Sequence, residues 1–130
     1  MVLIDTNVLL DVLVEGAQYN EESASRLVEA LKSGPLIVND IIATELAPVF
    51  ERAEGLWAAL SDAEIRLVPY PREAAFVAGH AFRRYRRQRG TRIRVLPDFM
   101  IGAPAVSLGI SLLTRDRGFY RAYFPNLKLF

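Results

Sequence analysis

Residues 2–10, which read VLIDTNVLL, decide the fold of this 130-residue chain. The first three of them form a short continuous apolar run, which is typical of a parallel strand that is buried on both faces. A helical pattern follows over residues 6–14, so we expect the chain to leave the strand through Asp5 and to enter a helix directly. This order of strand and helix predicts the start of an α/β fold.

The segments that follow repeat the alternation of strand and helix. Further strands are predicted at residues 36–38, 65–68, 111–114 and 127–129, and further helices at 21–31, 41–46, 53–60, 71–88, 97–109 and 117–123. Asp40 is expected to cap the helix that follows it, and Pro48 to kink or interrupt that helix. No linker rich in Pro, Gly or Ser divides the chain. We therefore expect residues 1–130 to form a single domain, an α/β sandwich with a mostly parallel sheet.

The composition fits a globular protein and excludes several kinds of site. Hydrophobic residues make up 52% of the chain and charged residues 24%, which is too apolar for a disordered chain. Cysteine is absent, so a disulfide framework, an iron–sulfur cluster, a zinc finger and a thiol nucleophile are excluded. The single histidine, His80, has no second soft ligand to join it, and we interpret it as a structural or surface residue.

Neither secretion nor a membrane span is indicated. The amino terminus has no basic segment and carries an acid at position 5, which is unlike a secretory signal. The longest uncharged run, residues 99–113, is shorter than the roughly 20 residues that a membrane helix needs. We expect a cytoplasmic protein with no membrane partner.

Charge is divided unevenly along the chain. The first 64 residues carry 12 acidic and 3 basic side chains, whereas the rest carry 3 acidic and 13 basic ones. Seven of these bases are the arginines at positions 83, 84, 86, 87, 89, 92 and 94. Such a basic run indicates a polyanion as partner.

Four acidic residues are predicted to meet at one edge of the sheet. Asp5 ends the first strand and Asp116 follows the fourth by two residues, so both lie at the carboxyl ends of strands, where parallel sheets bind ligands. Glu45 is about 7–8 Å along a helix that begins at this edge, at 1.5 Å per residue. Asp98 begins the helix that leads back across the sheet to the fourth strand. Four separate segments therefore bring an acid to the same edge.

A divalent metal would explain such a cluster, because crowded carboxylates repel one another and raise their own pKa values unless a cation neutralises them. Oxygen ligands without Cys or His select Mg²⁺ or Mn²⁺ over Zn²⁺. Such a metal can bind a phosphate oxygen, lower the pKa of a water and stabilise the leaving oxygen, which is what phosphodiester hydrolysis requires. We interpret three other acids, Asp11, Asp40 and Asp62, as helix caps or surface charges.

Four strings of the sequence closely resemble PIN-domain ribonucleases, in particular the VapC-type toxins of toxin–antitoxin pairs. In chain order they are LIDTNVLLD (3–11), ATEL (43–46), PDFMIGA (97–103) and LTRDRGFY (113–120). The resemblance covers nearly the whole chain. It implies a PIN-like three-layer sandwich, in which helices flank a five-stranded, mostly parallel sheet.

The resemblance also implies a reaction and its residues. The catalytic, metal-binding acids would be Asp5, Glu45, Asp98 and Asp116. Asn7 and Thr114 would be polar, substrate-binding members of the same pocket. The implied activity is Mg²⁺- or Mn²⁺-dependent cleavage of RNA by a metal-activated water. The implied partners are a cognate antitoxin protein and a second copy of the chain in a homodimer.

With RNA as substrate, the basic run gains a specific role. We expect Arg86, Arg87 and Arg89 to bind the RNA backbone, with Tyr85 as a stacking face among them. Two alternatives stay open: the run is a solvated helix end whose charges favour the helix dipole, or it serves the antitoxin.

Other readings of the sequence are weighed against this one. The alternative function is a non-catalytic PIN module that binds RNA or a protein partner, although the intact set of four acids argues against it. A phosphatase of the haloacid dehalogenase type is disfavoured, because Asn7 stands where that motif needs a second Asp. Thr6 could equally cap the first helix. Trp57 is expected in the core, with a groove for a partner as the alternative.

One departure from related sequences is Pro104, which stands where they often carry His. A proline there removes the helical hydrogen bond to the carbonyl of Met100 and should bend the helix that carries Asp98.

Overall fold

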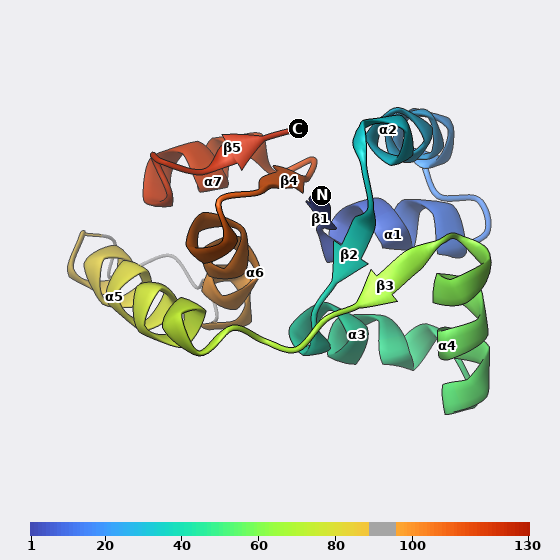
Figure 1. Ribbon diagram of the computed structural model, residues 1–130, viewed down its shortest axis with the longest axis horizontal. Coiled ribbons are helices and arrows are strands. Elements are labelled where there is room, and N and C mark those ends of the chain that lie inside the picture. The colour runs from blue at the N-terminus through green and yellow to red at the C-terminus, as the bar shows by residue number, and fades with distance from the viewer. Residues whose placement is uncertain (89–95) are drawn as a thin grey trace.

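The computed structural model describes residues 1–88 and 96–130, and Figure 1 labels its elements. The strands are β1 (Val2–Ile4), β2 (Leu36–Val38), β3 (Ile65–Leu67), β4 (Ser111–Leu113) and β5 (Lys128–Leu129). The helices are α1 (Thr6–Leu13), α2 (Asn20–Ser33), α3 (Asp40–Leu46), α4 (Ala53–Asp62), α5 (Arg72–Gln88), α6 (Leu96–Leu108) and α7 (Arg117–Tyr123), with a 3₁₀ helix, η1 (Ala47–Val49), after α3. Every predicted strand and helix is present, with ends that differ by one or two residues.

The five strands form one sheet in the order β3-β2-β1-β4-β5, and every neighbouring pair is parallel. The expected parallel sheet is confirmed, and within the described ranges it contains no antiparallel pair. The chain moves from β1 outward to β2 and β3, and then returns to β4 and β5 on the other side of β1. β1 and β4 are therefore the neighbours between which the strand order reverses. Ligands bind at this position in open parallel sheets.

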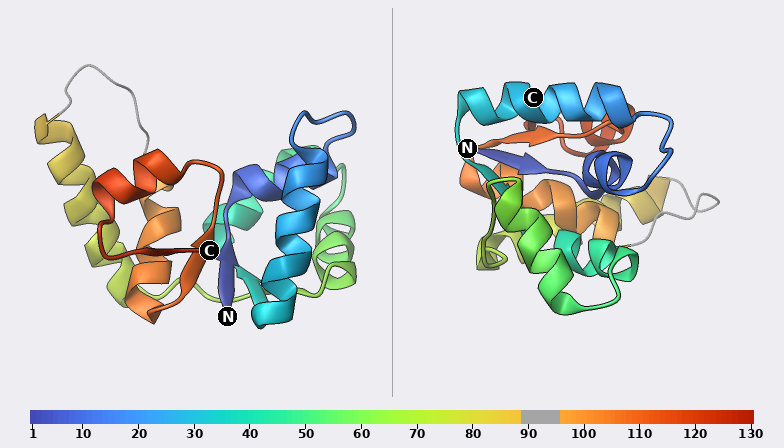
Figure 2. Two further views of the ribbon diagram at one scale, coloured as in Figure 1. Left: turned by 90° about the horizontal axis from the view of Figure 1, so that it is seen from above. Right: turned by 90° about the vertical axis from the view of Figure 1, so that its right-hand side faces the viewer.

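Helices cover both faces of the sheet, as a three-layer sandwich requires. Seen from above, α1, α2 and α4 lie on one side of the strands, and α5, α6 and α7 lie on the other (Figure 2, left). Right-handed crossovers have this result, because the chain crosses the sheet in opposite directions before and after β3. The central strand β1 is covered on both faces, and each of its three residues is at most 2% exposed.

An aromatic cluster fixes the start of α6. The ring of Phe99, which is 0% exposed, lies 5.3 Å from that of Phe82, 5.4 Å from that of Tyr85 and 5.2 Å from that of Phe119, between centroids. Offset and edge-to-face pairs of this kind each stabilise the fold by about 0.5–1.5 kcal/mol beyond the contribution of the apolar area that they bury. Phe99 therefore joins α6 to α5 and α7, and it holds the neighbouring Asp98 in place. Tyr85 is 3% exposed, so the prediction that it offers a stacking face is wrong.

Gly102 lets α6 approach α7 closely. A Cβ atom at this position would lie 2.9 Å from a ring carbon of Tyr120 and 3.0 Å from the ring of Phe124, well inside normal contact distance. The helix also continues through Pro104 to Leu108, so the proline does not end it. Asp98 is in the first turn of α6, before the carbonyl that loses its partner.

Two local predictions are wrong. Asn39, not Asp40, caps α3: the Asn39 side chain accepts a 3.0 Å hydrogen bond from the Ile42 N–H, while Asp40 is the exposed first residue of the helix. Asn39 is extended and precedes the helix by one residue, which is the geometry that capping needs. Trp57 is 46% exposed rather than part of the core, because Leu56 and Leu60 form the buried side of α4.

Several remaining predictions can be placed in the structure. Pro48 lies in η1, directly after the end of α3, so the expected interruption is confirmed. His80 is exposed, and its ring lies 4.3 Å from that of Phe76. Asp62 is exposed at the end of α4, as expected of a surface charge. Within residues 1–88 and 96–130, no helix is long and apolar enough to cross a membrane.

Candidate active site

The four acids that the sequence places at one edge line a single hollow of about 300 Å³. Asp5 follows β1, Glu45 lies in α3, Asp98 is in the first turn of α6, and Asp116 precedes α7. The remaining lining includes Thr6, Asn7, Leu10, Ile101, Phe119 and Tyr120. The hollow lies at the carboxyl ends of β1 and β4, so the reversal of strand order positions it.

Asp5 and Thr114 lie beside each other because β1 and β4 are in register. Ile4 pairs with Leu113, and the Asp5 N–H donates a 2.9 Å hydrogen bond to the Leu113 carbonyl. The Thr114 hydroxyl then donates a 2.6 Å hydrogen bond to Oδ2 of Asp5. Asn7, in the first turn of α1, donates to the same oxygen at 3.0 Å. The sheet thus gives Asp5 a fixed orientation.

Asp5 is 4% exposed, and burial raises its pKa from the ordinary 3.8 to about 6. Hydrogen bonds from the Thr114 and Tyr120 hydroxyls and from the Thr6 N–H favour the carboxylate and oppose this rise, while the nearby charge of Glu45 adds to it. Burial therefore outweighs these hydrogen bonds, and a cation bound beside Asp5 would lower its pKa again.

Thr114 and Asn7 also fix the segment that carries Asp116. Thr114 Oγ1 accepts hydrogen bonds from the Asp116 N–H at 3.0 Å and from Asn7 Nδ2 at 3.2 Å. Asn7 Oδ1 accepts one from the Arg115 N–H at 3.2 Å. The family resemblance named both as pocket members. Asn7 lines the acidic hollow and Thr114 does not, but together they link the segments that carry Asp5 and Asp116.

Tyr120 is a member of the site that the sequence did not single out. It is 3% exposed, and its hydroxyl is hydrogen-bonded to Asp5. Burial raises the pKa of Tyr120 far above its ordinary value, and the charges of Asp5, Asp98 and Asp116 raise it further, so the hydroxyl keeps its proton and donates it. The available signal was its spacing, since Tyr120 follows Asp116 by four residues and so lies on the same side of α7.

Thr6 contributes to the site rather than to a helix cap. The helix α1 begins at Thr6, with Asp5 in the cap position and without a side-chain capping bond. The Thr6 hydroxyl instead donates a hydrogen bond to Glu45 Oε2, across the gap between α1 and α3. Glu45 is thereby oriented from the first turn of α1.

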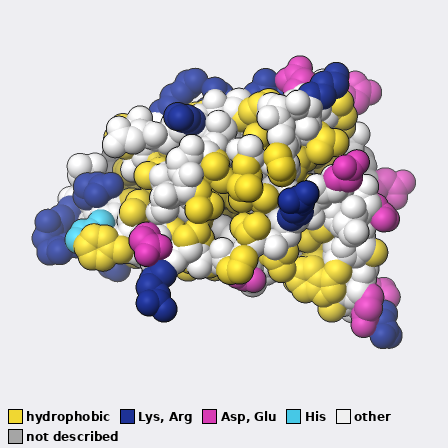
Figure 3. All heavy atoms as spheres, viewed as in Figure 1, with side chains coloured by type: hydrophobic (Ala, Val, Ile, Leu, Met, Phe, Trp, Pro, Cys, Tyr) yellow, Lys and Arg dark blue, Asp and Glu magenta, His cyan; other side chains and the backbone are white. Residues whose placement is uncertain are grey.

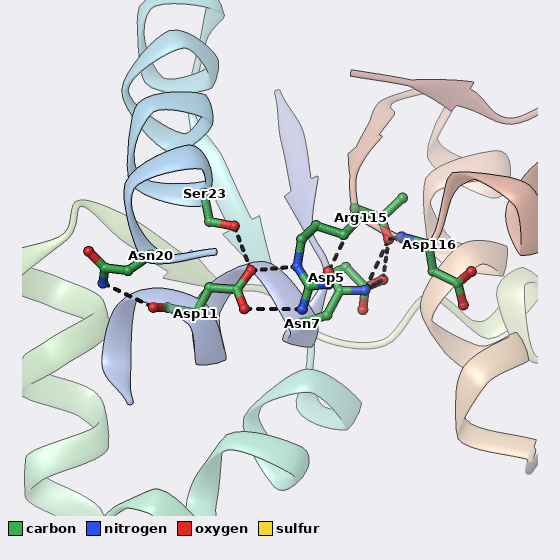
Figure 4. A network of polar contacts seen from close by, with 8 residues as sticks. Asp5, Asn7, Asp11, Asn20, Ser23, Arg115 and Asp116 are labelled. Carbon is green, nitrogen blue, oxygen red and sulfur yellow. Dashed lines mark hydrogen bonds and ion pairs between the residues drawn. The ribbon is translucent and has the colours of Figure 1, made fainter. Parts of the chain in front are cut away.

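The interpretation of Asp11 as a cap or surface charge is wrong. Asp11 is 6% exposed and accepts hydrogen bonds from Arg115 and Ser23, as Figure 4 shows. Arg115 lies between Thr114 and Asp116, so this ion pair borders the hollow without lining it. A pair 104 positions apart leaves no local pattern that sequence reasoning could have used.

Two of the predicted RNA-binding arginines, Arg86 and Arg87, do not line this hollow. Arg86 and Arg87 are exposed in the last turn of α5, and Arg89 lies outside the described residues. Figure 3 shows Lys and Arg side chains gathered at the left end of the molecule, where α5 lies, and most acidic side chains toward the right. The uneven charge of the sequence is therefore also a separation in space.

The donor set fits a hard divalent cation, since the hollow offers carboxylate and hydroxyl oxygens and no sulfur or imidazole. Among residues 1–88 and 96–130, no three Asp, Glu or His side chains are placed closely enough to enclose an ion. In this arrangement Asp5 and Glu45 instead accept hydrogen bonds from neighbouring side chains. The raised pKa of Asp5 is the property of this set that a bound cation would reverse.

Several solved structures are similar to this chain over nearly its whole length. VapBC-1 from nontypeable Haemophilus influenzae has a TM-score of 0.74 at 18% identity, over 100% of this chain and 97% of that one. VapBC2 from Rickettsia felis, bound to a promoter DNA fragment, has a TM-score of 0.72 at 20% identity, over 100% and 98%. VapC20 from Mycobacterium tuberculosis, a toxin that cleaves the sarcin-ricin loop, has a TM-score of 0.64 at 17% identity, over 98% and 99%.

At these identities the likeness establishes the fold. No curated protein sequence matches the chain. The sequence model of the PIN domain family matches residues 2–125, which is nearly the full length. Together with the parallel sheet and the four acids at its reversal point, this match shows that the chain belongs to the PIN domain family.

Proposed function

We propose that this protein is a Mg²⁺- or Mn²⁺-dependent endoribonuclease that acts in the cytoplasm as the toxin of a toxin–antitoxin pair. The observation that carries the proposal is the hollow lined by four carboxylates from four separate segments, at the ligand-binding position of a PIN fold. Residues 1–130 would act as one catalytic domain.

Four acids would hold the metal: Asp5, Glu45, Asp98 and Asp116. When bound, Mg²⁺ or Mn²⁺ supplies a water of lowered pKa and offsets the charge of the phosphate. The chain itself orients the acids. Tyr120, Thr114 and Asn7 hold Asp5 in one orientation, and Thr6 holds Glu45. Fixed partners of this kind keep metal-binding carboxylates directed at the ion.

RNA is the proposed substrate class, because the basic surface at the end of α5 suits a polyanion. Arg86 and Arg87 would contact phosphates, together with Arg89. The similar fold of VapC20, a toxin that cleaves the sarcin-ricin loop, supports RNA over other polyanions.

An antitoxin and a second copy of the chain are the proposed protein partners. Structural neighbours of this chain include VapBC2, VapBC-1 and a toxin–antitoxin complex from Klebsiella pneumoniae. A specific observation gives the antitoxin a place to bind: Trp57 is 46% exposed and lines two hollows, one of about 610 Å³ toward β3 and one of about 410 Å³ toward α3. A large exposed aromatic beside such hollows is typical of a protein interface.

The test is cleavage of a mixed RNA substrate by the purified protein with Mn²⁺ or Mg²⁺, and again after chelation by EDTA. Cleavage should require the metal and should disappear in Asp98→Asn. Asp62→Asn, an exposed acid at the end of α4, is the matched control and should cleave normally. RNA binding without cleavage under every metal condition would instead support the non-catalytic alternative.

A further inference from the structure

Two side chains of α1 bind Arg115, which lies between β4 and α7. One contacts the main chain of Arg115 and the other its guanidinium. Asn7 and Asp11 are four residues apart, so they lie on the same side of α1. Asn7 Oδ1 accepts a 3.2 Å hydrogen bond from the Arg115 N–H, and Asp11 binds the Arg115 guanidinium. Figure 4 shows this arrangement. The position of Arg115 is therefore set by two contacts from one helix.

The contact between Asp11 and Arg115 is a bidentate ion pair. Arg115 Nε donates to Asp11 Oδ2 at 2.6 Å, and Nη2 donates to Oδ1 at 3.0 Å. The Asp11 side chain is 8% exposed and that of Arg115 is 35% exposed, so solvent screens the pair less than a surface salt bridge. This geometry needs a guanidinium, because an ammonium group cannot donate two parallel hydrogen bonds to one carboxylate.

The start of α2 holds Asp11 in turn. The Ser23 hydroxyl donates to Asp11 Oδ2 at 2.6 Å, and Asn20 Nδ2 donates to the Asp11 carbonyl at 3.0 Å. The ring of Tyr19 covers the Arg115 guanidinium at 4.3 Å from its centroid. These contacts leave the Asp11 carboxylate and the Arg115 guanidinium little freedom to rotate.

Arg115 is covalently linked to two residues of the candidate site. Its neighbour Thr114 donates to Asp5, and its other neighbour Asp116 donates its N–H to Thr114. Residues 114–116 thus connect the ion pair of Arg115 to the carboxylates of Asp5 and Asp116. Any displacement of Arg115 moves both of its neighbours.

We propose that Arg115, held by Asp11, is a positioning residue for the metal-binding acids Asp5 and Asp116. It lines no part of the acidic hollow, and it acts through the hydrogen bonds of Thr114 and Asn7. The inference rests on the proposed metal-dependent function. Outer partners of metal ligands typically change metal affinity by about 10–100-fold when they are replaced.

The experiment measures Mn²⁺ binding to the purified full chain by electron paramagnetic resonance, without RNA. Arg115→Met and Asp11→Asn should each weaken Mn²⁺ affinity by about tenfold or more. Arg115→Lys keeps the charge but loses the bidentate contact with Asp11, and it should also weaken Mn²⁺ binding. This third variant keeps the test decisive if either of the others fails to fold.

Arg26→Met is the matched control. The Arg26 side chain is 39% exposed, donates a 2.6 Å hydrogen bond to the Phe130 carbonyl and lies over the Phe130 ring at 5.2 Å, but makes no described contact with residues 114–116. It should lower the melting temperature and leave Mn²⁺ affinity unchanged. The double variant of Asp11 and Arg115 should lose no more affinity than the single ones, since both remove the same contact.

The outcomes separate the two proposals. Mn²⁺ affinity that is unchanged in the Arg115 variants, or losses that add in the double variant, would overturn the positioning role while the metal site stands. Absence of Mn²⁺ binding by the unmodified chain would overturn the proposed function, and the positioning role with it.

Discussion

Thr114 donates a 2.6 Å hydrogen bond to Asp5 across 109 positions of sequence. The contact exists because β1 and β4 are parallel neighbours in register, so the residues that follow Ile4 and Leu113 lie side by side. The candidate site is therefore an extension of strand pairing, and its properties should respond to changes in both the acids and the packing around them.

The first prediction concerns Asp5 and pH. Since burial raises the pKa of Asp5 from 3.8 to about 6, the folded state binds this proton more tightly than the unfolded state does. At 1.36 kcal/mol per pKa unit, the free energy of unfolding of the metal-free protein should lose about 3 kcal/mol as the pH rises from about 4 through 6. Asp5→Asn removes this group, so the variant should become the more stable of the two above pH 6. Urea unfolding of both proteins between pH 4 and 8 measures the difference. A variant that is less stable at pH 7 would show that Asp5 stabilises the fold.

The second prediction concerns the close packing at Gly102. Gly102→Ala places a methyl group 2.9 Å from the Tyr120 ring, so it should destabilise the protein by about 1–3 kcal/mol and move the hydroxyl that orients Asp5. Gly79→Ala in α5 is the matched control, because nothing lies within 4 Å of its Cβ position. It should be neutral or stabilising by up to about 1 kcal/mol. Thermal unfolding and Mn²⁺ titration of both variants make the comparison, and equal behaviour would contradict the packing argument.

The third prediction concerns the arginines at the end of α5. Changing Arg86, Arg87 and Arg89 to Gln in an Asp98→Asn background should weaken RNA binding several-fold at low salt. Each lost phosphate contact should flatten the dependence of log K on log salt by about 0.7 for single-stranded RNA. The maximal cleavage rate of the otherwise unmodified protein should change little, because Arg86 and Arg87 do not line the acidic hollow.

Arg66→Gln controls for a general loss of charge, since Arg66 is an exposed arginine on the edge strand β3. The salt slope of RNA binding for this variant should match that of the protein that keeps Arg86, Arg87 and Arg89. Identical slopes for the triple variant as well would assign the arginines to the antitoxin or to solvent.

The fourth prediction uses the single tryptophan of the chain. Trp57 is 46% exposed, so its fluorescence should shift to shorter wavelength when the proposed antitoxin covers it. Trp57→Ala should weaken that complex by tenfold or more, as is typical of a central interface tryptophan. Phe76→Ala, at a 71% exposed position on α5, should leave the affinity unchanged. An unshifted emission spectrum in a formed complex would place the antitoxin elsewhere.

Sequence reasoning was most successful where a local pattern has one physical explanation. Apolar runs such as residues 2–4 and 36–38 predicted buried parallel strands, and the carboxyl ends of those strands predicted where Asp5 and Asp116 lie. It was least successful for side chains whose environment depends on distant segments. Tyr85 and Trp57 have exposures opposite to those predicted. Tyr85 shares the buried side of α5 with Ala78 and Ala81, so its helical spacing was a better guide than its arginine neighbours.

The polar contacts around the site show the same limit. Asp11 resembles any acid near the end of a helix, and only the fold brings Arg115 to it. The bond from Thr6 to Glu45 likewise depends on the angle between two helices that are adjacent only in space. The cap of α3 is different, because it could have been predicted from the sequence. An Asn directly before a helix is a recognised capping pattern, and it favours Asn39 over Asp40.

The pairing of β1 with β4 also governs when the site can come into being. β4 is formed by residues 111–113, so a growing polypeptide lacks this neighbour of β1 until residue 113 has been synthesised. Thr114 and Asp116 come later still. Contacts between such distant segments form late, because a long loop must close before they gain any stability. The acidic hollow therefore cannot assemble on a nascent chain before residues 111–116 have been synthesised, so translation delays the appearance of the site.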